Sequence, residues 1–355
     1  MSTASSRAAS SPEPVSVVDS APDLVETLDA PRSVRLRVPA TSANLGPGYD
    51  CMGLALGLHD EIDVEAAPRA AEAAAAVRVD VDGEGAGALP ADASHLVVSL
   101  IERILVARGR RLPDLTVRAR NRIPHSRGLG SSAAAIASAV VVADQLLPDG
   151  LDADEQLQIG ARIEGHPDNY APALRGGLAV SWREGETFRT ARLRPHPRLR
   201  TVLAVPTAEQ STTAARGVLP EQIPHAEAAD NSARSALLVH ALTAEPELLL
   251  PATEDRLHQQ QRRGAFPASM DLVDRLREAG HAAVISGAGP SVLILADGDE
   301  AAEAARRRIG EAVDVVDPAA AGVEEGRRHE AGPDTWRSLI PPISDVGATV
   351  EAHRR

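Results

Sequence analysis

The segment PHSRGLGSSAA, residues 124–134, constrains this chain more than any other, because it stands between a predicted strand and a predicted helix. Apolar and polar residues alternate through 115–123, which predicts a strand, and the alanine- and valine-rich run 131–147 has helical length. Glycines let the backbone approach an anion closely, and the free N–H groups and dipole of a helix N-terminus favour negative charge. The segment therefore predicts a phosphate site.

Two other interpretations of this segment stay open. The glycines and serines can form a plain turn that ends in a serine N-cap. The spacing Gly128-x-Gly130-x-x-Ala133 also fits the dinucleotide-binding pattern, in which alanine is tolerated at the third glycine position. The lysine P-loop and Schiff-base chemistry are excluded, because all 37 Lys+Arg residues of the chain are arginine.

Two further turns combine glycine with polar residues. The first, PATSANLGPGYD at 39–50, follows a predicted strand, and its Asn44 and Asp50 can bind a polar ligand or hydrogen-bond within their own turn. The second, SGAGPS at 286–291, joins two short apolar strands and can be a tight hairpin. Three such turns in one chain indicate a shared function.

Composition restricts the classes of partner. With 50 acidic and 37 basic residues the formal net charge is -13, and aromatic residues make up 2% of the chain. Neither nucleic acid nor an anionic membrane is therefore expected as a partner. Cys51 is the single cysteine, and the chain has no apolar run of membrane-spanning length. We expect a cytoplasmic protein without disulfides.

The length of 355 residues predicts two domains. Val34, Leu36 and Val38 alternate with arginines, so the folded core begins near residue 33. Two prolines between Arg192 and Arg200 predict the boundary between the domains. We expect a disordered tail at 1–32, domains at 33–195 and 196–316, and a C-terminal extension at 317–355 without a clear period.

In this order, PATSANLGPGYD, the P-x-x-x-GLGSSAA segment and SGAGPS resemble the three sequence motifs of the GHMP kinases. The first motif is similar to the version in the homoserine kinase branch of that family. The resemblance covers residues 33–316 and implies an α+β fold, with two layers of α/β structure. It implies an N-terminal domain with a left-handed β-α-β unit and a ferredoxin-like C-terminal domain, with ATP and substrate in the cleft between them.

The resemblance also implies roles for particular residues. It assigns Mg²⁺ to Glu164, with Ser131 or Ser132 as a second ligand, and oxygen ligands of this kind suit that ion. The segment EGHPDN at 164–169 is shorter than in many relatives and can instead be a solvated acidic turn. Asp168 stands where a related kinase has a catalytic base, although phosphoryl transfer can proceed by positioning and charge stabilisation without one. The residues expected to bind ATP are Pro124, Arg127, Gly128, Leu129, Gly130, Ser131, Ser132, Ala133 and Ala134.

An amino-acid alcohol such as L-homoserine presents an ammonium, a carboxylate and a hydroxyl. Asp50 can pair with the ammonium, and the planar fork of Arg216 or Arg262 suits the carboxylate. Either arginine can instead be an exposed solubilising residue. The resemblance adds Arg216 to the catalytic set beside Asp168 and Glu164. Asn44, His166 and Thr212 complete the expected pocket.

The resemblance thus implies an ATP-dependent kinase that phosphorylates the hydroxyl of L-homoserine to O-phospho-L-homoserine in threonine biosynthesis, with ATP and Mg²⁺ as cofactors. It further implies a homodimer. Two alternatives stay open: a GHMP kinase that acts on another small hydroxylated metabolite, and a non-catalytic scaffold that binds ATP.

Overall fold

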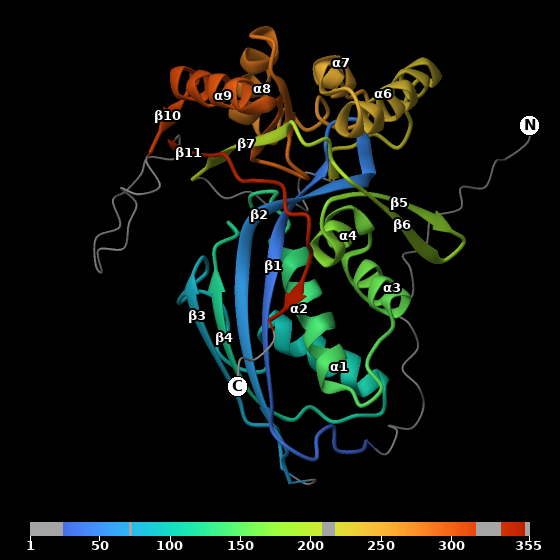
Figure 1. The fold of residues 1–355 in the computed structure, drawn as a ribbon, viewed down its shortest axis with the longest axis vertical. Helices are drawn as coiled ribbons and strands as arrows, with labels where there is room; N and C mark the ends of the chain where they lie inside the picture. The colour runs from blue at the N-terminus through green and yellow to red at the C-terminus, as the bar shows by residue number, and fades with distance from the viewer. Residues whose placement is uncertain (1–23, 71–72, 208–216, 317–334, 352–355) are drawn as a thin grey trace, which may run out of the picture.

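Two β-sheets, one above the other in Figure 1, divide the chain into an N-terminal and a C-terminal domain. The computed structural model describes residues 24–70, 73–207, 217–316 and 335–351. Helices α1 to α4 lie beside the larger sheet, and α6 to α9 lie around the smaller one. This arrangement confirms the expected α+β class.

Within the described residues, the larger sheet has seven strands. Its order is β12-β1-β2-β4-β3, and β5 and β6 extend from β2 as a hairpin. The long strands β1 and β2 pair antiparallel, from Arg32 opposite Ala66 to Asn44 opposite Gly48, so a tight turn joins them. The strands are β1 (Arg32–Asn44), β2 (Gly48–Ala67), β3 (Val77–Gly83), β4 (Asp114–Asn121), β5 (Leu178–Glu184), β6 (Thr187–Leu193) and β12 (Thr349–Val350).

A β-α-β unit forms the outer part of this sheet. β3 and β4 are parallel neighbours, with Val77 opposite Leu115. Parallel strands need a crossover connection, and α1 (Leu96–Ala107) supplies it. In β1, the buried Val34, Leu36 and Val38 alternate with exposed arginines, as predicted.

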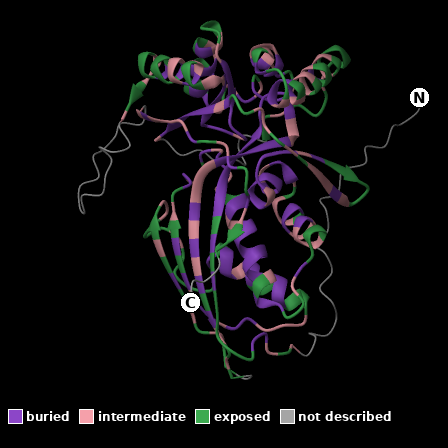
Figure 2. Cartoon of the chain, in the orientation of Figure 1, coloured by how far each residue is buried: buried purple, intermediate pink, exposed green. Residues whose placement is uncertain are grey.

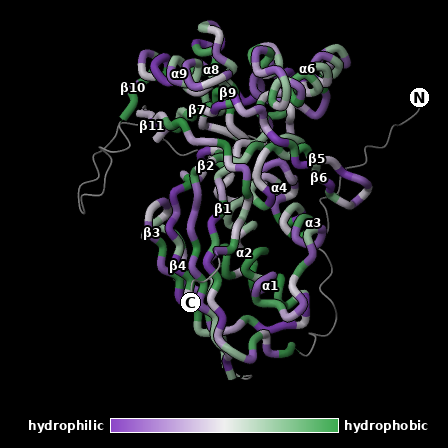
Figure 3. The backbone as a smooth tube through the Cα atoms, in the orientation of Figure 1, coloured by the Kyte–Doolittle hydropathy of each residue, from purple (hydrophilic) through white to green (hydrophobic). Residues whose placement is uncertain are grey.

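Helix α2 (Ser131–Leu146) is the central helix of the N-terminal domain, and it confirms the helix predicted over 131–147. Most of its residues are buried, because α1, α3 (Ala153–Glu164) and α4 (Pro167–Arg175) pack around it against the sheet. Its many alanines and valines let these elements approach closely, and Figures 2 and 3 show the helix as buried and hydrophobic. The helix therefore holds its N-terminus, the end of the glycine segment, in a fixed place.

In the part of the chain that the structure describes, the smaller sheet has five strands in the order β10-β11-β7-β9-β8. β11, β7, β9 and β8 pair antiparallel, which is the strand order of a ferredoxin-like domain that starts with β7. The strands are β7 (Leu199–Pro206), β8 (Ala282–Ile285), β9 (Val292–Asp297), β10 (Asp314–Val315) and β11 (Thr335–Leu339).

Strand β7 separates two hydrophobic cores. Val202 and Ala204 belong to the core formed with α8 and α9. The alternate residues Leu203 and Val205 belong to the core shared by α6, α7 and the N-terminal domain. None of the helices in the described ranges is long and apolar enough to cross a membrane. The helices of this domain are α6 (His225–Thr243), η1 (Pro246–Leu248), α7 (Leu249–Ala252), α8 (Pro267–Glu278) and α9 (Gly298–Ala312).

Residues 335–351, which we expected in an extension without a clear period, run along both domains. β11 pairs with β7 in the smaller sheet, and β12 pairs with β1 in the larger one. Between them, Gly57 N donates to the Pro342 carbonyl at 2.6 Å and Gly177 N to the Ser344 carbonyl at 2.8 Å. This segment, red in Figure 1, therefore ties the two sheets together.

Candidate active site

The three glycine-rich turns meet at one place between the domains. Ser286 Oγ, in the loop between β8 and β9, lies 2.6 Å from the Gly128 carbonyl oxygen and 2.8 Å from Ser42 Oγ. Asn44 Nδ2 donates to the Gly287 carbonyl at 2.9 Å. The loop of the C-terminal domain therefore connects the glycine segment to the end of β1.

The glycine loop, residues 127–130, depends on two residues without side chains. Gly128 and Gly130 both have a φ of 70°, in the left-handed region. A Cβ on Gly128 would lie 2.2 Å from the Ser286 carbonyl oxygen, and one on Gly130 would lie 1.9 Å from Thr41 Oγ1. Gly130 is also the N-cap of α2 and offers no capping side chain. A bound anion can therefore use the N–H groups of the first turn.

A cleft of about 530 Å³ opens beside this turn. Its volume is in the range of small-molecule sites. Gly287 and Ala288 line it from the C-terminal domain, so the cleft lies between the domains, as the resemblance implied. The predicted residues that line it are Asn44, Gly128, Leu129, Gly130, Ser131, Ser132, Glu164, His166, Asp168 and Arg262.

Glu164 and Ser132 bring two oxygen atoms to the start of α2. Ser132 Oγ lies 3.4 Å from Glu164 Oε2. Glu164 is the last residue of α3, which ends at the left-handed C-cap Gly165, and α3 packs against α2. The junction of the two helices thus places a carboxylate and a hydroxyl next to the predicted phosphate site, and this donor set fits Mg²⁺.

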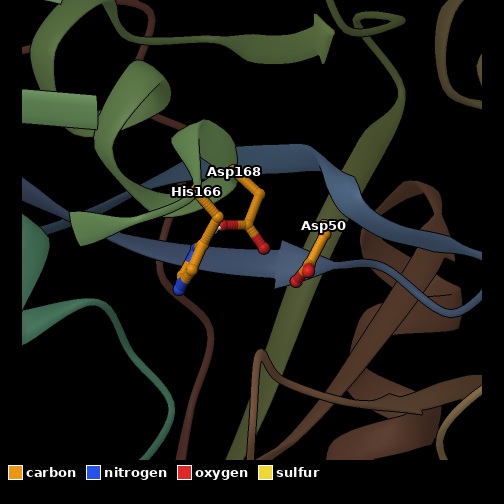
Figure 4. A group of neighbouring side chains, drawn as sticks. All are labelled: Asp50, His166 and Asp168. Atoms are coloured by element: carbon orange, nitrogen blue, oxygen red, sulfur yellow. Dashed lines mark hydrogen bonds and ion pairs between the residues drawn. The ribbon is translucent and has the colours of Figure 1, made fainter. Parts of the chain in front are cut away.

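Asp50, His166 and Asp168 form a second polar cluster beside the cleft (Figure 4). A ligand atom of each lies within 4.8 Å of the other two, and His166 Nδ1 contacts Asp168 Oδ1 directly. Asp168 is buried in the first turn of α4, where the helix dipole favours a carboxylate. Asp50 is the third residue of β2 and donates its backbone N–H to Asn44 Oδ1 at 3.0 Å. Two carboxylates and an imidazole can bind a cation such as an ammonium.

Arg262 brings a positive charge to the cleft. The residue is 1% exposed, and its Nη1 donates to His258 Nδ1 at 2.9 Å. Its guanidinium carbon also lies 5.6 Å from the ring centroid of Tyr49, within the range of cation–π attraction. A guanidinium held in this way is suited to bind a carboxylate.

Comparisons with known proteins agree with this geometry. Two family models match, GHMP kinases N terminal domain over residues 95–177 and GHMP kinases C terminal over residues 238–315. Homoserine kinase of Streptomyces avermitilis is 49% identical over 277 residues, which are 77% of this chain and 89% of that protein. Homoserine kinase of Leifsonia xyli subsp. xyli is 46% identical over 330 residues, 92% of this chain and 95% of that protein. The chain belongs to the homoserine kinase family of GHMP kinases.

Solved structures share the fold. The crystal structure of homoserine kinase from Cytophaga hutchinsonii matches with a TM-score of 0.73 and 25% identity, over 90% of this chain and 97% of that one. A mevalonate diphosphate decarboxylase from Enterococcus faecalis matches with a TM-score of 0.62 and 15% identity, over 91% of this chain and 100% of that one. The second likeness shows the fold alone. As a GHMP kinase, this chain is an ATP-dependent enzyme.

In this GHMP kinase, Arg127 connects the domains. Its guanidinium donates to the carbonyls of His125 and Pro206, both at 2.9 Å, and to the carbonyl of Thr207. Because Pro206 is the last residue of β7, the side chain ties the glycine loop to the C-terminal domain. Sequence reasoning missed this structural role, since nothing in the sequence indicates which carbonyls a buried arginine will meet.

Other predicted residues of the kinase lie outside the cleft lining. Ala133 and Ala134 are buried in the core, where they pack α2, and Pro124 is buried before the glycine loop. Thr212 and Arg216 lie outside the described residues. A direct role for any of them in binding ATP or substrate stays a prediction.

A second cavity of about 360 Å³ adjoins the cleft, and both are lined by Leu96, Ser126, Ser131 and Ser132. His95 lines this cavity, and its buried Nδ1 has no hydrogen-bond partner among the described residues. Burial, together with the nearby His125, holds the pKa of His95 below its usual range. The apolar wall of this second cavity is formed by Ile62, Leu89, Val97, Val117, Ala119 and Ala135.

Asp60 is a buried carboxylate in the wall of the same cavity. Its Oδ1 accepts the backbone N–H groups of Arg122 at 2.7 Å and Ile123 at 2.9 Å. Burial nevertheless raises the pKa of Asp60 to about 6. Sequence reasoning missed this cavity because its residues come from separate segments between 60 and 135.

Proposed function

We propose that this kinase transfers the γ-phosphoryl group of ATP to the hydroxyl of L-homoserine and so forms O-phospho-L-homoserine for threonine synthesis. One observation carries the proposal: the start of α2, a carboxylate cluster and a buried arginine surround a single cleft of about 530 Å³. These are the partners that a phosphate, an ammonium and a carboxylate require. The relatives named homoserine kinase support the choice of substrate.

ATP would occupy the cleft and the adjoining cavity together. The first-turn N–H groups of α2, behind Gly128 and Gly130, would bind the phosphates. The apolar cavity of about 360 Å³ would hold the base, because flat aromatic rings gain most from apolar walls. His95 Nδ1, buried in that cavity with no hydrogen-bond partner in the part of the chain that the structure describes, would accept a hydrogen bond from an amino group of the base.

The amino-acid substrate would take the opposite part of the cleft. Its ammonium would pair with Asp50, and its carboxylate would bind the guanidinium of Arg262. This orientation would direct the side-chain hydroxyl toward the phosphates. Asn44 supports the site by fixing both Asp50, through the 3.0 Å bond to its N–H, and the Gly287 carbonyl at 2.9 Å.

Mg²⁺ would be held by Glu164 with Ser132 or Ser131. The 3.4 Å separation of Ser132 Oγ and Glu164 Oε2 supports this assignment, because two oxygens this close can face one ion. When bound, Mg²⁺ offsets the negative charge of the transferring phosphoryl group. The oxygens of Glu164 and the serines are the part of that arrangement which this chain supplies.

The hydroxyl proton would pass to the His166–Asp168 pair. These side chains touch and line the cleft, so an acceptor is within reach of a bound alcohol. A weak acceptor is sufficient, because positioning and charge stabilisation supply most of the rate in phosphoryl transfer. His166, which is more exposed than the buried Asp168, would be the nearer of the two to the substrate.

A substrate panel tests the proposal. ADP release would be measured with L-homoserine, mevalonate, galactose and L-threonine as acceptors at equal concentration. We expect turnover with L-homoserine to exceed that with each other acceptor by more than an order of magnitude. Mevalonate and galactose lack the ammonium, and the hydroxyl of L-threonine is a secondary one on Cβ, one carbon closer to the carboxylate than that of L-homoserine. Turnover of another acceptor without L-homoserine would instead favour a different GHMP substrate, and no turnover at all would favour an ATP-binding scaffold.

We also propose a homodimer in the cytoplasm, as the family resemblance implies. Light scattering coupled to size exclusion measures the oligomeric state directly. A mass of twice 37.1 kDa is expected. A monomer at micromolar concentration would contradict the dimer and leave the proposed reaction untouched.

A further inference from the structure

A buried histidine lies between Arg262 and the turn that joins β1 to β2. His258 is 0% exposed. Its Nδ1 lies 2.9 Å from Arg262 Nη1, and its Nε2 lies 2.9 Å from the Gly46 carbonyl oxygen. The imidazole therefore bridges the first motif and the arginine of the cleft, and the proposed reaction does not use it.

These two contacts establish which imidazole nitrogen carries the proton. A guanidinium only donates, so Nδ1 of His258 must accept and carries no hydrogen. A carbonyl oxygen only accepts, so Nε2 must donate to Gly46. Burial and the charge of Arg262 hold the pKa of His258 below its usual range, against the opposing effect of Asp255, whose Oδ1 lies 3.6 Å from Nε2. The imidazole is thus neutral, with its proton on Nε2.

The surroundings hold His258 firmly in this orientation. The Asp255 carboxylate accepts the backbone N–H groups of His258 at 3.0 Å and Gln259 at 2.8 Å, which fixes the backbone of this turn. The ring of Tyr49 lies 5.2 Å from the His258 ring and 5.6 Å from the Arg262 guanidinium carbon. Imidazole, phenol ring and guanidinium therefore pack as one unit, in which His258 and Arg262 are buried and Tyr49 is half-buried.

We infer that His258 is a positioning residue, whose neutral imidazole holds the Arg262 guanidinium in the orientation that binds the carboxylate of the amino-acid substrate. This inference rests on the proposed function, which gives Arg262 that ligand. Arginine has a long, flexible side chain, and holding it in place before binding removes part of the entropic cost of binding. Among the described residues, the imidazole hydrogen-bonds to Gly46 and Arg262, and those that line the cleft do not include His258. Its effect on substrate therefore passes through Arg262.

Three substitutions separate the two hydrogen bonds of His258. His258→Phe keeps a ring of similar size and removes both bonds. His258→Asn places an amide oxygen near the position of Nδ1 and restores an acceptor for Arg262. His258→Gln places its amide near Nε2 and can restore only the bond to Gly46. His240→Phe, at a half-exposed position on α6, is the matched control.

The KM for L-homoserine should separate these variants. We expect it to rise on the order of tenfold in His258→Phe, the usual effect of losing a hydrogen bond to a charged group. His258→Asn should recover most of this loss, His258→Gln little of it, and His240→Phe should match the wild type. The KM for ATP should stay unchanged in all four, because the glycine loop is intact. Equal KM values for L-homoserine in His258→Phe, His258→Asn and the wild type would overturn the inference.

Imidazole nitrogen chemical shifts of the wild-type protein, measured by NMR, provide a second test that needs no variant. They should report a neutral His258 with its proton on Nε2 at pH 7. A charged ring, or a proton on Nδ1, would overturn the inference even where a variant failed to fold. Failure of the wild type to phosphorylate L-homoserine would reject the proposed function. Normal turnover by the wild type, together with an unchanged KM for L-homoserine in His258→Phe, would reject the role of His258 alone.

Discussion

Ser132 Oγ lies 3.4 Å from Glu164 Oε2, and this contact joins the first turn of α2 to the last residue of α3. Helices α2 and α3 pack against each other, so the fold itself brings the two oxygens together. A hydroxyl beside a carboxylate at a phosphate-binding helix start is the arrangement expected of a metal-assisted phosphoryl transfer.

Glu164→Gln should therefore lower turnover. The amide keeps the size of the side chain but removes the charge that attracts Mg²⁺. We expect kcat to fall by more than about tenfold and the Mg²⁺ concentration for half-maximal activity to rise. Steady-state kinetics over a magnesium titration measures both. Glu186→Gln, in the exposed turn between β5 and β6, is the control, and equal magnesium curves for the two variants would remove Glu164 from the metal site.

Gly130→Ala should weaken ATP binding. The added Cβ would lie 1.9 Å from Thr41 Oγ1, so the turn at the start of α2 must move. Gly185→Ala is the matched control, because Gly185 also has a positive φ of 60° but has open space around it. Both variants should lose roughly 1–2 kcal/mol from the left-handed backbone. Only Gly130→Ala should raise the KM for ATP, and the same KM in both would contradict this account of the loop.

Asp60→Asn should stabilise the protein above pH 6. The pKa of Asp60 is raised to about 6, so the folded state binds its proton more tightly than the unfolded state does. The stabilising contribution of this group is complete below its ordinary pKa of 3.8 and is lost as the pH rises through 6. Asparagine keeps an oxygen for the N–H groups of Arg122 and Ile123 without the buried charge.

Urea unfolding at pH 8 should show Asp60→Asn more stable than the wild type by up to about 3 kcal/mol, at about 1.4 kcal/mol for each unit of pKa shift. The difference should shrink between pH 6 and pH 4. Asp82→Asn, at an exposed position of β3, should show no such pH dependence. A constant difference across this range would mean that the charge of Asp60 is not its cause.

Gly347→Ala should detach the segment at 335–351 from the N-terminal domain. Its Cβ would lie 2.3 Å from the carbonyl carbon and oxygen of Leu174 in α4. We expect a lower Tm in calorimetry, since the segment ties the two sheets together. Gly310→Ala, in α9 with open space, should instead raise the stability by about 0.5–1 kcal/mol. An unchanged Tm in Gly347→Ala would show that this contact contributes little to stability.

The sequence was sufficient where local chemistry decides the structure. Val34, Leu36 and Val38 lie on the buried face of β1, because successive side chains of a strand point to opposite faces of the sheet. The helix at 131–147 follows from composition and length, and Gly128 and Gly130 follow from the need for left-handed backbone. The periodicity of apolar residues could not indicate that the three glycine-rich turns meet in one cleft, and the resemblance of the three motifs to those of GHMP kinases supplied that prediction.

The sequence was insufficient where residues far apart in the chain decide the structure. Residues 335–339 form β11 because β7, more than a hundred residues earlier, offers an open edge. Arg127 likewise hydrogen-bonds to the carbonyl of Pro206 in β7, and His258 to that of Gly46, across long distances in the sequence. The wall of the second cavity is likewise assembled from separate segments. Such contacts depend on the assembled fold and leave no local pattern.

The central claim is that the hydroxyl of L-homoserine receives the γ-phosphoryl group of ATP. Phosphorus NMR of a reaction with ATP, Mg²⁺ and L-homoserine tests it most directly. We predict a new phosphomonoester signal coupled to the side-chain methylene of homoserine, growing at the same rate as the signals of ADP. Release of inorganic phosphate without this ester, or no loss of ATP at all, would contradict the claim.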